Sequence, residues 1–583
     1  MKTGIIFTRK TLNRWRIRQM LKVGSKRTAE LRDPSEVMKL SRMGSFHQSR
    51  LSFMRILMRQ LKDENWSFKK VEFNINEKGV GHAVYSAVGP TNTYSLVAFA
   101  HDLPDDKRSD RVIADAWDAT FTLFDGVPTS TDIERLEKNV PFQEVGRISE
   151  NELCLSRANK SVRLWDHVIS SLSNGRQPKI EQIDSVGYLM RTTAVYGSGK
   201  FGAVDRDFVS DRIEFAAPFQ SELLSVFMIR WFVLDLVNHM AKLKNPDKFV
   251  SLDSSLAHRL GIGNSTGLGM APFLLNHPTL LNNWILARET ALSRVRSIHS
   301  SSVEENKLFL ELFKNSCSLM QLWRSDHSLQ IQKLKELGND LELLKHHLKD
   351  LDLRSQSPWD KLYHWTRKNL SLEGQELIIS LMMEPYGDIV DELSSTMSDN
   401  TNSYVKINGL KTVGEIRAQL RDAYSWIFKI DWEKNEANAR AWYVSQEKLE
   451  PRLGERFSEP VEDYEQPLSP ARDAYRLSED LNQFNDNMLM ANFLMQKPEH
   501  RHTIRRLQII LESPYAEIQD NTIGSELLPI DMLRCKLSFF GAIHFDPRSD
   551  RWVRICMFKG APYPDQMSNS VSDYWSYLEG FSS

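Results

Sequence analysis

The sequence predicts a predominantly helical α+β protein with an N-terminal antiparallel β-meander, central buried helices and a C-terminal β-hairpin. Three observations predict this class. Residues 70–100 hold three short β-like runs separated by turn residues. Residues 219–243 are apolar nearly all round a helix, which is typical of a buried central helix. Lys536–Asp546 and Arg551–Phe558 are two β-like runs joined by a turn, which predicts the hairpin.

The elements are expected in the following order. A helix with a basic face at 46–62 precedes strands at 70–76, 81–88 and 94–100, and further helices are expected near 109–120, 130–138 and 156–172. Residues 219–350 are helical, and more helices follow near 371–397, 412–428 and 469–496. Arg354–Pro358 has the composition of a linker. The predicted division is a basic extension (1–45), a mixed α+β domain (46–215), a helical domain (216–353) and a mostly helical domain ending in the hairpin (359–583).

Composition limits the class of protein. The chain has 583 residues, of which 41% are hydrophobic and 26% charged, and this excludes a disordered chain. The 75 Lys and Arg residues balance 76 Asp and Glu residues, which excludes a uniformly basic nucleic-acid coat, so no specific nucleic-acid partner is expected. The four cysteines are widely spaced and no secretory signal is visible, which favours a cytoplasmic location.

The N-terminal 29 residues contain nine basic residues and no acidic residue. This pattern is shared by organelle-targeting segments, by basic arms that contact RNA or anionic lipid, and by plain basic extensions, and these readings stay open. No transmembrane segment is predicted. The best candidate, Leu223–Leu236, is interrupted by Arg230 and Asp235, and a spanning helix needs about 20 largely apolar residues.

Two glycine-rich segments have the composition of an anion site. Gly261–Pro272 has four glycines around Asn264, Ser265 and Thr266, so that backbone N–H groups can approach a phosphate or carboxylate closely. Arg191–Arg206 adds Arg191 and Lys200 on a second glycine-rich turn. A tight helix connection and an exposed hairpin turn, respectively, are the structural alternatives. Gly263–Gly267 also matches the G-x-S-x-G pattern of a nucleophilic Ser265, without the strand that should precede it.

The buried helix supplies the candidate acid–base pair. Asp235 and His239 lie one turn apart on one face, where the carboxylate can orient the imidazole and stabilise its protonated form. A structural polar network is the alternative, and no third ligand for a metal is identifiable. Basic residues of two further segments either line an anion pocket or lie on solvated helix faces: Arg157, Lys160 and Ser161, and Arg50, Arg55 and Arg59 beside His47.

These patterns favour a soluble enzyme of the lyase or transferase class that acts on a small anionic, carboxylated or phosphorylated substrate. His239 and Asp235 would move a proton by non-redox chemistry, while Arg191, Lys200 and the backbone of Gly263–Thr266 would hold the substrate. The sequence leaves the cofactor and the oligomeric state unknown. The alternative is a non-catalytic scaffold whose basic N-terminal region contacts RNA, anionic lipid or an acidic partner.

Overall fold

The structure is a computed structural model, and it describes residues 29–102, 117–139, 149–193, 220–264, 278–321, 323, 328–397, 407–425, 427–429, 431–433, 442–444, 451–453, 463–465, 469–518, 529–542, 544–547 and 553–567. Its strands are β1 (Ser67–Ile75), β2 (Gly81–Val88), β3 (Thr93–Ala100), β4 (Ala119–Asp125), β5 (Glu152–Lys160), β6 (Tyr188–Thr193), β7 (Gly261–Asn264), β8 (Trp442–Val444), β9 (Pro451–Leu453), β10 (Asp463–Glu465), β11 (His544–Pro547) and β12 (Val553–Met557).

The α-helices are α2 (Pro34–Val37), α3 (Leu40–Met43), α4 (Phe53–Asp63), α5 (Ser130–Asn139), α6 (Trp165–Ser173), α7 (Ile180–Val186), α9 (Gln220–Lys244), α10 (Ser254–His258), α12 (Pro278–Arg296), α13 (Val303–Met320), α14 (Ser328–Asp350), α15 (Pro358–Asn369), α16 (Leu372–Met383), α17 (Gly387–Val390), α18 (Val413–Ala423), α20 (Ser469–Leu481), α21 (Met490–Gln496), α22 (Arg501–Glu512) and α23 (Pro529–Phe540). Short 3-10 turns lie at Asp391–Thr396, Ile427–Lys429, Pro498–His500 and Pro564–Gln566. The mixed α+β class is therefore confirmed.

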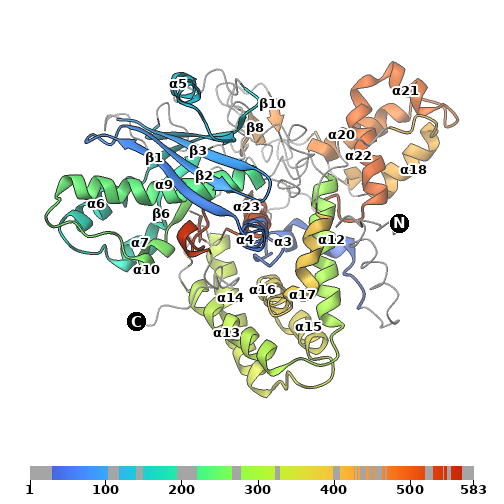
Figure 1. Cartoon of the computed structure of the whole chain (residues 1–583). Helices are drawn as coiled ribbons and strands as arrows, with labels where there is room; N and C mark the ends of the chain where they lie inside the picture. The colour runs from blue at the N-terminus through green and yellow to red at the C-terminus, as the bar shows by residue number, and fades with distance from the viewer. Residues whose placement is uncertain are drawn as a thin grey trace, which may run out of the picture.

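A large mixed sheet dominates one side of the molecule (Figure 1). Its strand order is β1-β2-β3-β4-β5-β6-β7-β12-β11, and neighbouring strands are antiparallel except for β6 and β7. The predicted meander is its first part, because β1, β2 and β3 lie where the three runs were expected. The sheet then continues through strands that the sequence did not reveal. One of these is β5, in the segment predicted to begin a helix at residue 156.

Two helices cover opposite faces of this sheet (Figure 1). On one face, Phe232 of α9 packs against Tyr85 and Phe121. On the other, Ile133 and Leu136 of α5 belong to a small apolar cluster with residues of β2 to β5. The predicted buried central helix is thus α9. By length and composition α9 is also apolar enough to cross a membrane, and 67% of its most apolar window is buried inside the protein. Core helices of soluble proteins pass the same test, so the absence of a transmembrane segment stays a prediction.

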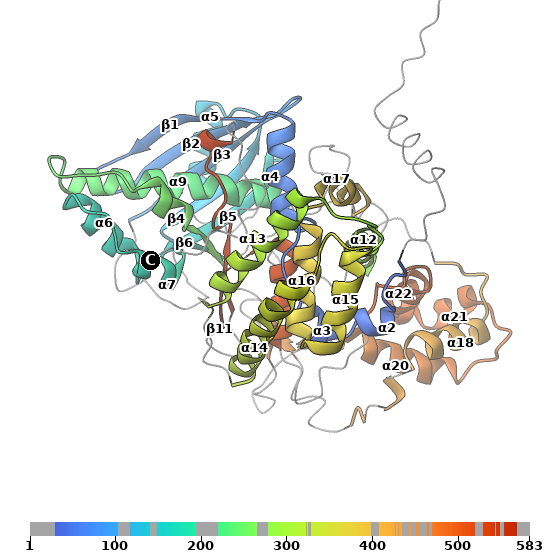
Figure 2. The same ribbon diagram turned by 90° about the horizontal axis from the view of Figure 1, so that it is seen from below.

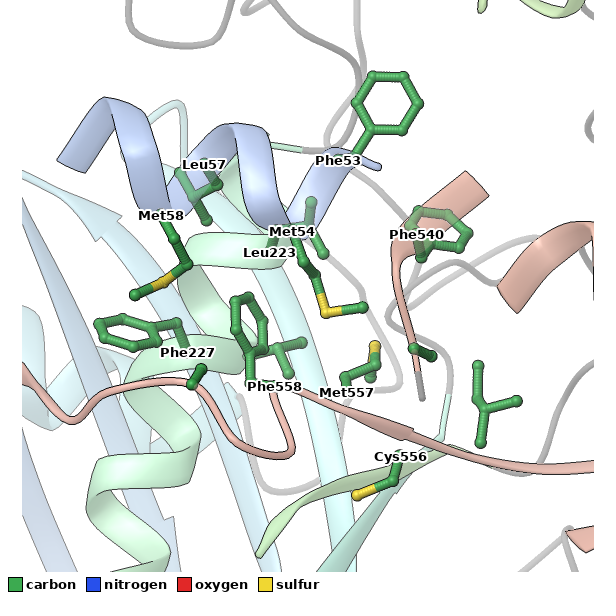
Figure 3. Packing of buried hydrophobic residues seen from close by; sticks show 14 of the residues in the cluster. Phe53, Met54, Leu57, Met58, Leu223, Phe227, Phe540, Cys556, Met557 and Phe558 are labelled. Atoms are coloured by element: carbon green, nitrogen blue, oxygen red, sulfur yellow. The ribbon is translucent and has the colours of Figure 1, made fainter. Parts of the chain in front are cut away.

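The C-terminal hairpin is matched only in part. Strands β11 and β12 pair as a hairpin, but residues 529–540 form the helix α23. The described residues of α23 that are buried are Asp531, Arg534, Cys535, Ser538, Phe539 and Phe540. The hairpin also forms no separate unit, because β12 pairs with β7 and so extends the large sheet. Figure 3 shows Met557 and Phe558 packed against α4 and the first turns of α9.

The main core runs through most of the chain. It contains buried residues from Val37 to Met567, and residues of all four predicted domains contribute to it. The boundaries predicted near 45, 215 and 353 therefore do not separate independent cores, and whether they divide units that fold alone stays a prediction. A second, small core joins α18, α20, α21 and α22 into a helical lobe beside the main body (Figure 2).

Candidate functional site

The predicted acid–base pair occupies two separate environments. Asp235 accepts a hydrogen bond from the Tyr85 hydroxyl at 2.8 Å, and Lys70 Nζ lies 3.1 Å from the same carboxylate. His239 Nε2 lies 3.1 Å from the backbone carbonyl of Ile75, to which it donates, and its ring packs against Phe73. Burial, and then the nearby Asp235 charge, raise the pKa of Tyr85. These contacts hold α9 against β1 and β2. They correspond to the structural polar network that the sequence allowed as the alternative to a catalytic pair.

Arg191 lies on the other side of the sheet. Burial and the charge of Glu222 raise the pKa of Cys154 on β5, and the Cys154 side chain hydrogen-bonds with Ser225. Glu222 and Ser225 both belong to α9, so residues 154, 156 and 158 face α9. Asn159 lies opposite Arg191 in the β5–β6 pairing, and paired residues project from the same face. Arg191 therefore projects away from α9. The predicted proton-transfer pair and the predicted anion-binding arginine cannot act on one small ligand in this fold.

The two glycine-rich segments are described only at their beginnings. Gly263 and Asn264 belong to β7, where Gly263 lies opposite Arg191 of β6. A Cβ atom on Gly263 would lie 2.7 Å from ring atoms of Tyr188, so glycine is required here for close packing within the sheet. The proposed cradle for an anion at Ser265 and Thr266, and the cation Lys200, lie outside the described residues.

The arginines of the first predicted helix pair with carboxylates, and Arg50 and Arg55 are buried. Arg55 makes two hydrogen bonds to the carboxylate of Glu384, at 2.5 and 2.6 Å, and neither side chain is exposed. Arg50 donates to Asp391, and Arg59 Nε lies 3.5 Å from that same carboxylate. Their charge is thus matched within the chain. An interaction role for the basic region now depends on residues 1–28, which lie outside the described residues, and it stays a prediction.

A second ion-pair network fixes the segment before α4. The carboxylate of Glu376 on α16 accepts hydrogen bonds from Arg32, Arg42 and Arg288, at 2.6, 2.8 and 2.5 Å. Burial alone would raise the pKa of Glu376, but these three guanidinium groups outweigh it and hold the pKa well below its usual range. Every group here has a partner of opposite charge, so the network is a structural tie rather than a ligand site.

The strongest candidate site is a polar region on the face of the sheet that carries α5. Under α5 this face is apolar, with Val84, Val97 and Phe99 among its buried residues. Toward β6 its character changes. We call this region the polar half-face, and it consists of His101, Asp118, Thr120, Arg157, Asn159 and Arg191.

Hydrogen bonds and charge pairs organise the polar half-face. Asp118 is 1% exposed, and its carboxylate accepts from the backbone N–H of Lys160 at 2.9 Å while Lys160 Nζ lies 3.5 Å away. Asn159 accepts a hydrogen bond from the backbone N–H of Asp118. The Arg157 guanidinium lies over the ring of Trp117 at 3.7 Å. Among the described residues, Arg157 and Arg191 of adjacent strands thus share this face with the Asp118 carboxylate, which pairs with Lys160.

His101 supplies the titratable group of this region. Its Nε2 lies 2.9 Å from the hydroxyl oxygen of the buried Thr120. Burial lowers the pKa of His101; Asp118 opposes this shift and Lys160 reinforces it. The ring is therefore neutral at pH 7. When Nε2–H donates to Thr120, the lone pair lies on Nδ1, which is then the atom that can accept a proton.

Metal ligation has one geometric candidate among the described residues. Oxygen and nitrogen atoms of Asp480, Glu499 and His500 lie within 4.8 Å of one another in the helical lobe. However, Lys497 Nζ lies 3.0 Å from Asp480 and His500 Nε2 lies 2.7 Å from it. A lysine cation at this carboxylate favours an ion-pair network over a metal site.

Sequence reasoning found Arg191, Arg157 and Lys160 but missed His101, Thr120 and Asn159. Arg157 and Lys160 were placed on a helix, whereas both lie on β5. Alternation along 118–124 was the available signal, since Thr120 and Thr122 share a face with Phe124. Comparisons with protein-family models, with curated proteins and with solved structures find no match to this chain.

Proposed function

We propose that the polar half-face binds a small anionic substrate, carboxylated or phosphorylated, and that the protein is an enzyme that transfers protons in non-redox group-transfer or elimination chemistry. One observation carries the proposal. A single sheet face changes from apolar residues under α5 to a cluster of buried polar and cationic side chains. Burying such groups costs free energy unless they are paired, and clusters of them favour binding sites.

The roles follow from side-chain chemistry. The guanidinium groups of Arg157 and Arg191 are planar forks of donors that match a carboxylate or phosphate. His101 is neutral at pH 7, so its Nδ1 can remove a proton from the bound substrate or return one to a leaving group. Thr120 fixes the ring orientation through its hydroxyl. Asp235 and His239 have no role in this proposal, because they lie beyond the opposite face.

Anion binding is the first test, because it needs no knowledge of the reaction. Inorganic phosphate should raise the melting temperature of the full chain, since a ligand that binds only the native state stabilises it by mass action. Arg191→Gln and Arg157→Gln should each remove most of this shift. Arg176→Gln is the matched control, because Arg176 is exposed in the turn after α6. Equal shifts in all four proteins would contradict the proposal.

The catalytic part needs a second readout. Phosphorylated and carboxylated metabolites would be screened by thermal shift, and the stabilising ones incubated with the protein and analysed by mass spectrometry. His101→Gln should keep the ligand-induced shift and lose the conversion, because the amide retains a hydrogen bond but cannot exchange a proton near pH 7. If these ligands stabilise the unmodified protein but none of them is converted, the protein binds anions without catalysis and the proposed enzymatic activity is refuted.

A further inference from the structure

We propose that an aromatic and acidic surface of the helical lobe docks an arginine-rich segment of another protein. The surface is made of three aromatic side chains and three carboxylates: Phe428, Trp432, Tyr475, Asp431, Glu433 and Glu479. We call the three rings the aromatic row. The proposal does not depend on the anion site of the large sheet, because it uses other residues in another part of the fold.

Tyr475 contacts both other rings of the aromatic row. Its ring centroid lies 6.4 Å from that of Phe428 and 6.1 Å from that of Trp432, which are ordinary distances for packed aromatic pairs. The Trp432 Nε1–H group donates a hydrogen bond to the backbone carbonyl of Ile427 at 3.1 Å. Phe428 lies in the short 3-10 turn that begins at Ile427, and Tyr475 lies on α20. A turn, a helix and a hydrogen bond thus fix the positions of the rings.

The aromatic row leaves ring surface open to solvent. Phe428 is 43% exposed, and Trp432 and Tyr475 are half-buried. The face of an aromatic ring carries partial negative charge and attracts cations. Trp432 shows this attraction within the chain, because the guanidinium carbon of Arg472 lies 5.5 Å from its ring centroid. We therefore expect the accessible faces of Phe428 and Tyr475 to attract a further cation.

Carboxylates make the surroundings of Tyr475 negative. Its hydroxyl hydrogen-bonds with Glu479, which lies one turn further along α20. The charge of Glu479 is the main cause that raises the pKa of Tyr475, and Glu433 and Asp431 act in the same direction. All three carboxylate side chains belong to exposed residues, so a partner can reach them. A cation that approaches the rings therefore also meets acceptors for its N–H groups.

Arginine matches this combination better than other cationic groups. A planar guanidinium group stacks on an aromatic face and donates hydrogen bonds to carboxylates from its edge, whereas an ammonium group is a compact, strongly hydrated charge. Tryptophan, tyrosine and arginine are also the residues that contribute most to binding between proteins. A segment with several arginines can place one side chain on the rings and others at the carboxylates, so the surface fits a peptide rather than a single small cation.

The test compares two peptides of equal charge. Isothermal titration of the full chain with hexa-arginine and with hexa-lysine would be carried out at physiological ionic strength, which screens attraction between distant charges. Hexa-arginine should bind about threefold more tightly than hexa-lysine, because only guanidinium groups stack on the rings. Phe428→Leu should remove this difference, since leucine keeps apolar volume without a π face. Phe428→Tyr should retain it and so guards against a folding defect.

A second pair of variants tests the carboxylates. Glu479→Gln should weaken the binding of both peptides. Glu512→Gln is the matched control and should change neither affinity, because Glu512 is an exposed carboxylate of the same lobe at the end of α22.

Three results would overturn the inference. Equal affinities for the two peptides, or no binding of either, would leave no role for the rings. Binding that neither Phe428→Leu nor Glu479→Gln alters would place the peptide elsewhere on the protein. Free arginine binding as tightly as hexa-arginine would identify a site for a small cation instead of a docking surface.

Discussion

Replacing Glu376 by glutamine gives the sharpest test of how the buried charges hold the fold. Its carboxylate accepts hydrogen bonds from Arg32, Arg42 and Arg288, and it is 0% exposed. Glutamine keeps the shape of the Glu376 side chain but removes its negative charge. Its amide N–H groups would also face the guanidinium donors of the three arginines. Removing one partner of a buried ion pair costs about 3–5 kcal/mol. Glu289 still pairs with Arg32, which keeps the expected loss within this range.

Hydrogen exchange measures this loss locally, which is needed because a chain of this size does not have to unfold in two states. A loss of about 3–5 kcal/mol lowers the protection of amides in 32–43 and 372–383 by about 10²- to 10⁴-fold. Glu392→Gln is the matched control, since Glu392 pairs with Arg294 at 2.6 Å on the surface, where such pairs contribute about 0–1 kcal/mol. Similar exchange in the two variants would refute the argument that burial gives the network its strength.

Four further results are expected. Burial lowers the pKa of His47 to about 4, so between pH 6.5 and 4 the unfolded chain binds a proton that the folded chain does not. The free energy of unfolding should therefore fall by about 3 kcal/mol as the pH drops through this window. His47→Gln should flatten the pH dependence of the urea midpoint. Arg230 donates hydrogen bonds to the backbone carbonyls of Leu260 and Ala561, at 2.7 and 2.8 Å. Arg230→Met should therefore lower the free energy of unfolding by about 2–4 kcal/mol and speed hydrogen exchange at residues 559–563. Unchanged exchange there would show that Arg230 does not hold this segment in place. Tyr85→Phe removes a hydrogen bond to Asp235 and should cost about 1–3 kcal/mol in thermal unfolding, with phosphate binding unaltered. His239→Ala should likewise leave phosphate binding intact, and a loss of binding would restore the pair on α9 as part of the site.

The sequence predicted those helices and strands whose own residues show a helical or an alternating pattern of apolar side chains. Alternation through Val71, Phe73 and Ile75 predicted β1, although Val71 is 55% exposed because the pairing with β2 is irregular between Lys70 and Glu72. The apolar circumference of 219–243 predicted the burial of α9. In contrast, β5 contains residues of good helix propensity, and its strand form depends on pairing with β4 and β6 on both sides.

Contacts between distant segments set the limit of prediction. A run such as Arg50, Arg55 and Arg59 has the appearance of a solvated helix face, because the partner carboxylates lie far along the chain. Arg55 and Glu384 are separated by 329 residues. The polar half-face raises the same difficulty. Its residues come from three strands and two strand ends, and only the sheet order brings His101 and Arg191 onto one face.

Anomalous scattering tests most directly whether an anion binds to the polar half-face at Arg157 and Arg191. Crystals of the protein soaked in selenate would be measured at the selenium edge, which locates the anion independently of any assay. We expect a peak on the α5 side of the sheet within hydrogen-bond distance of the Arg157 or the Arg191 guanidinium group. Ordered selenate elsewhere, with no peak at either arginine, would contradict the proposed anion site.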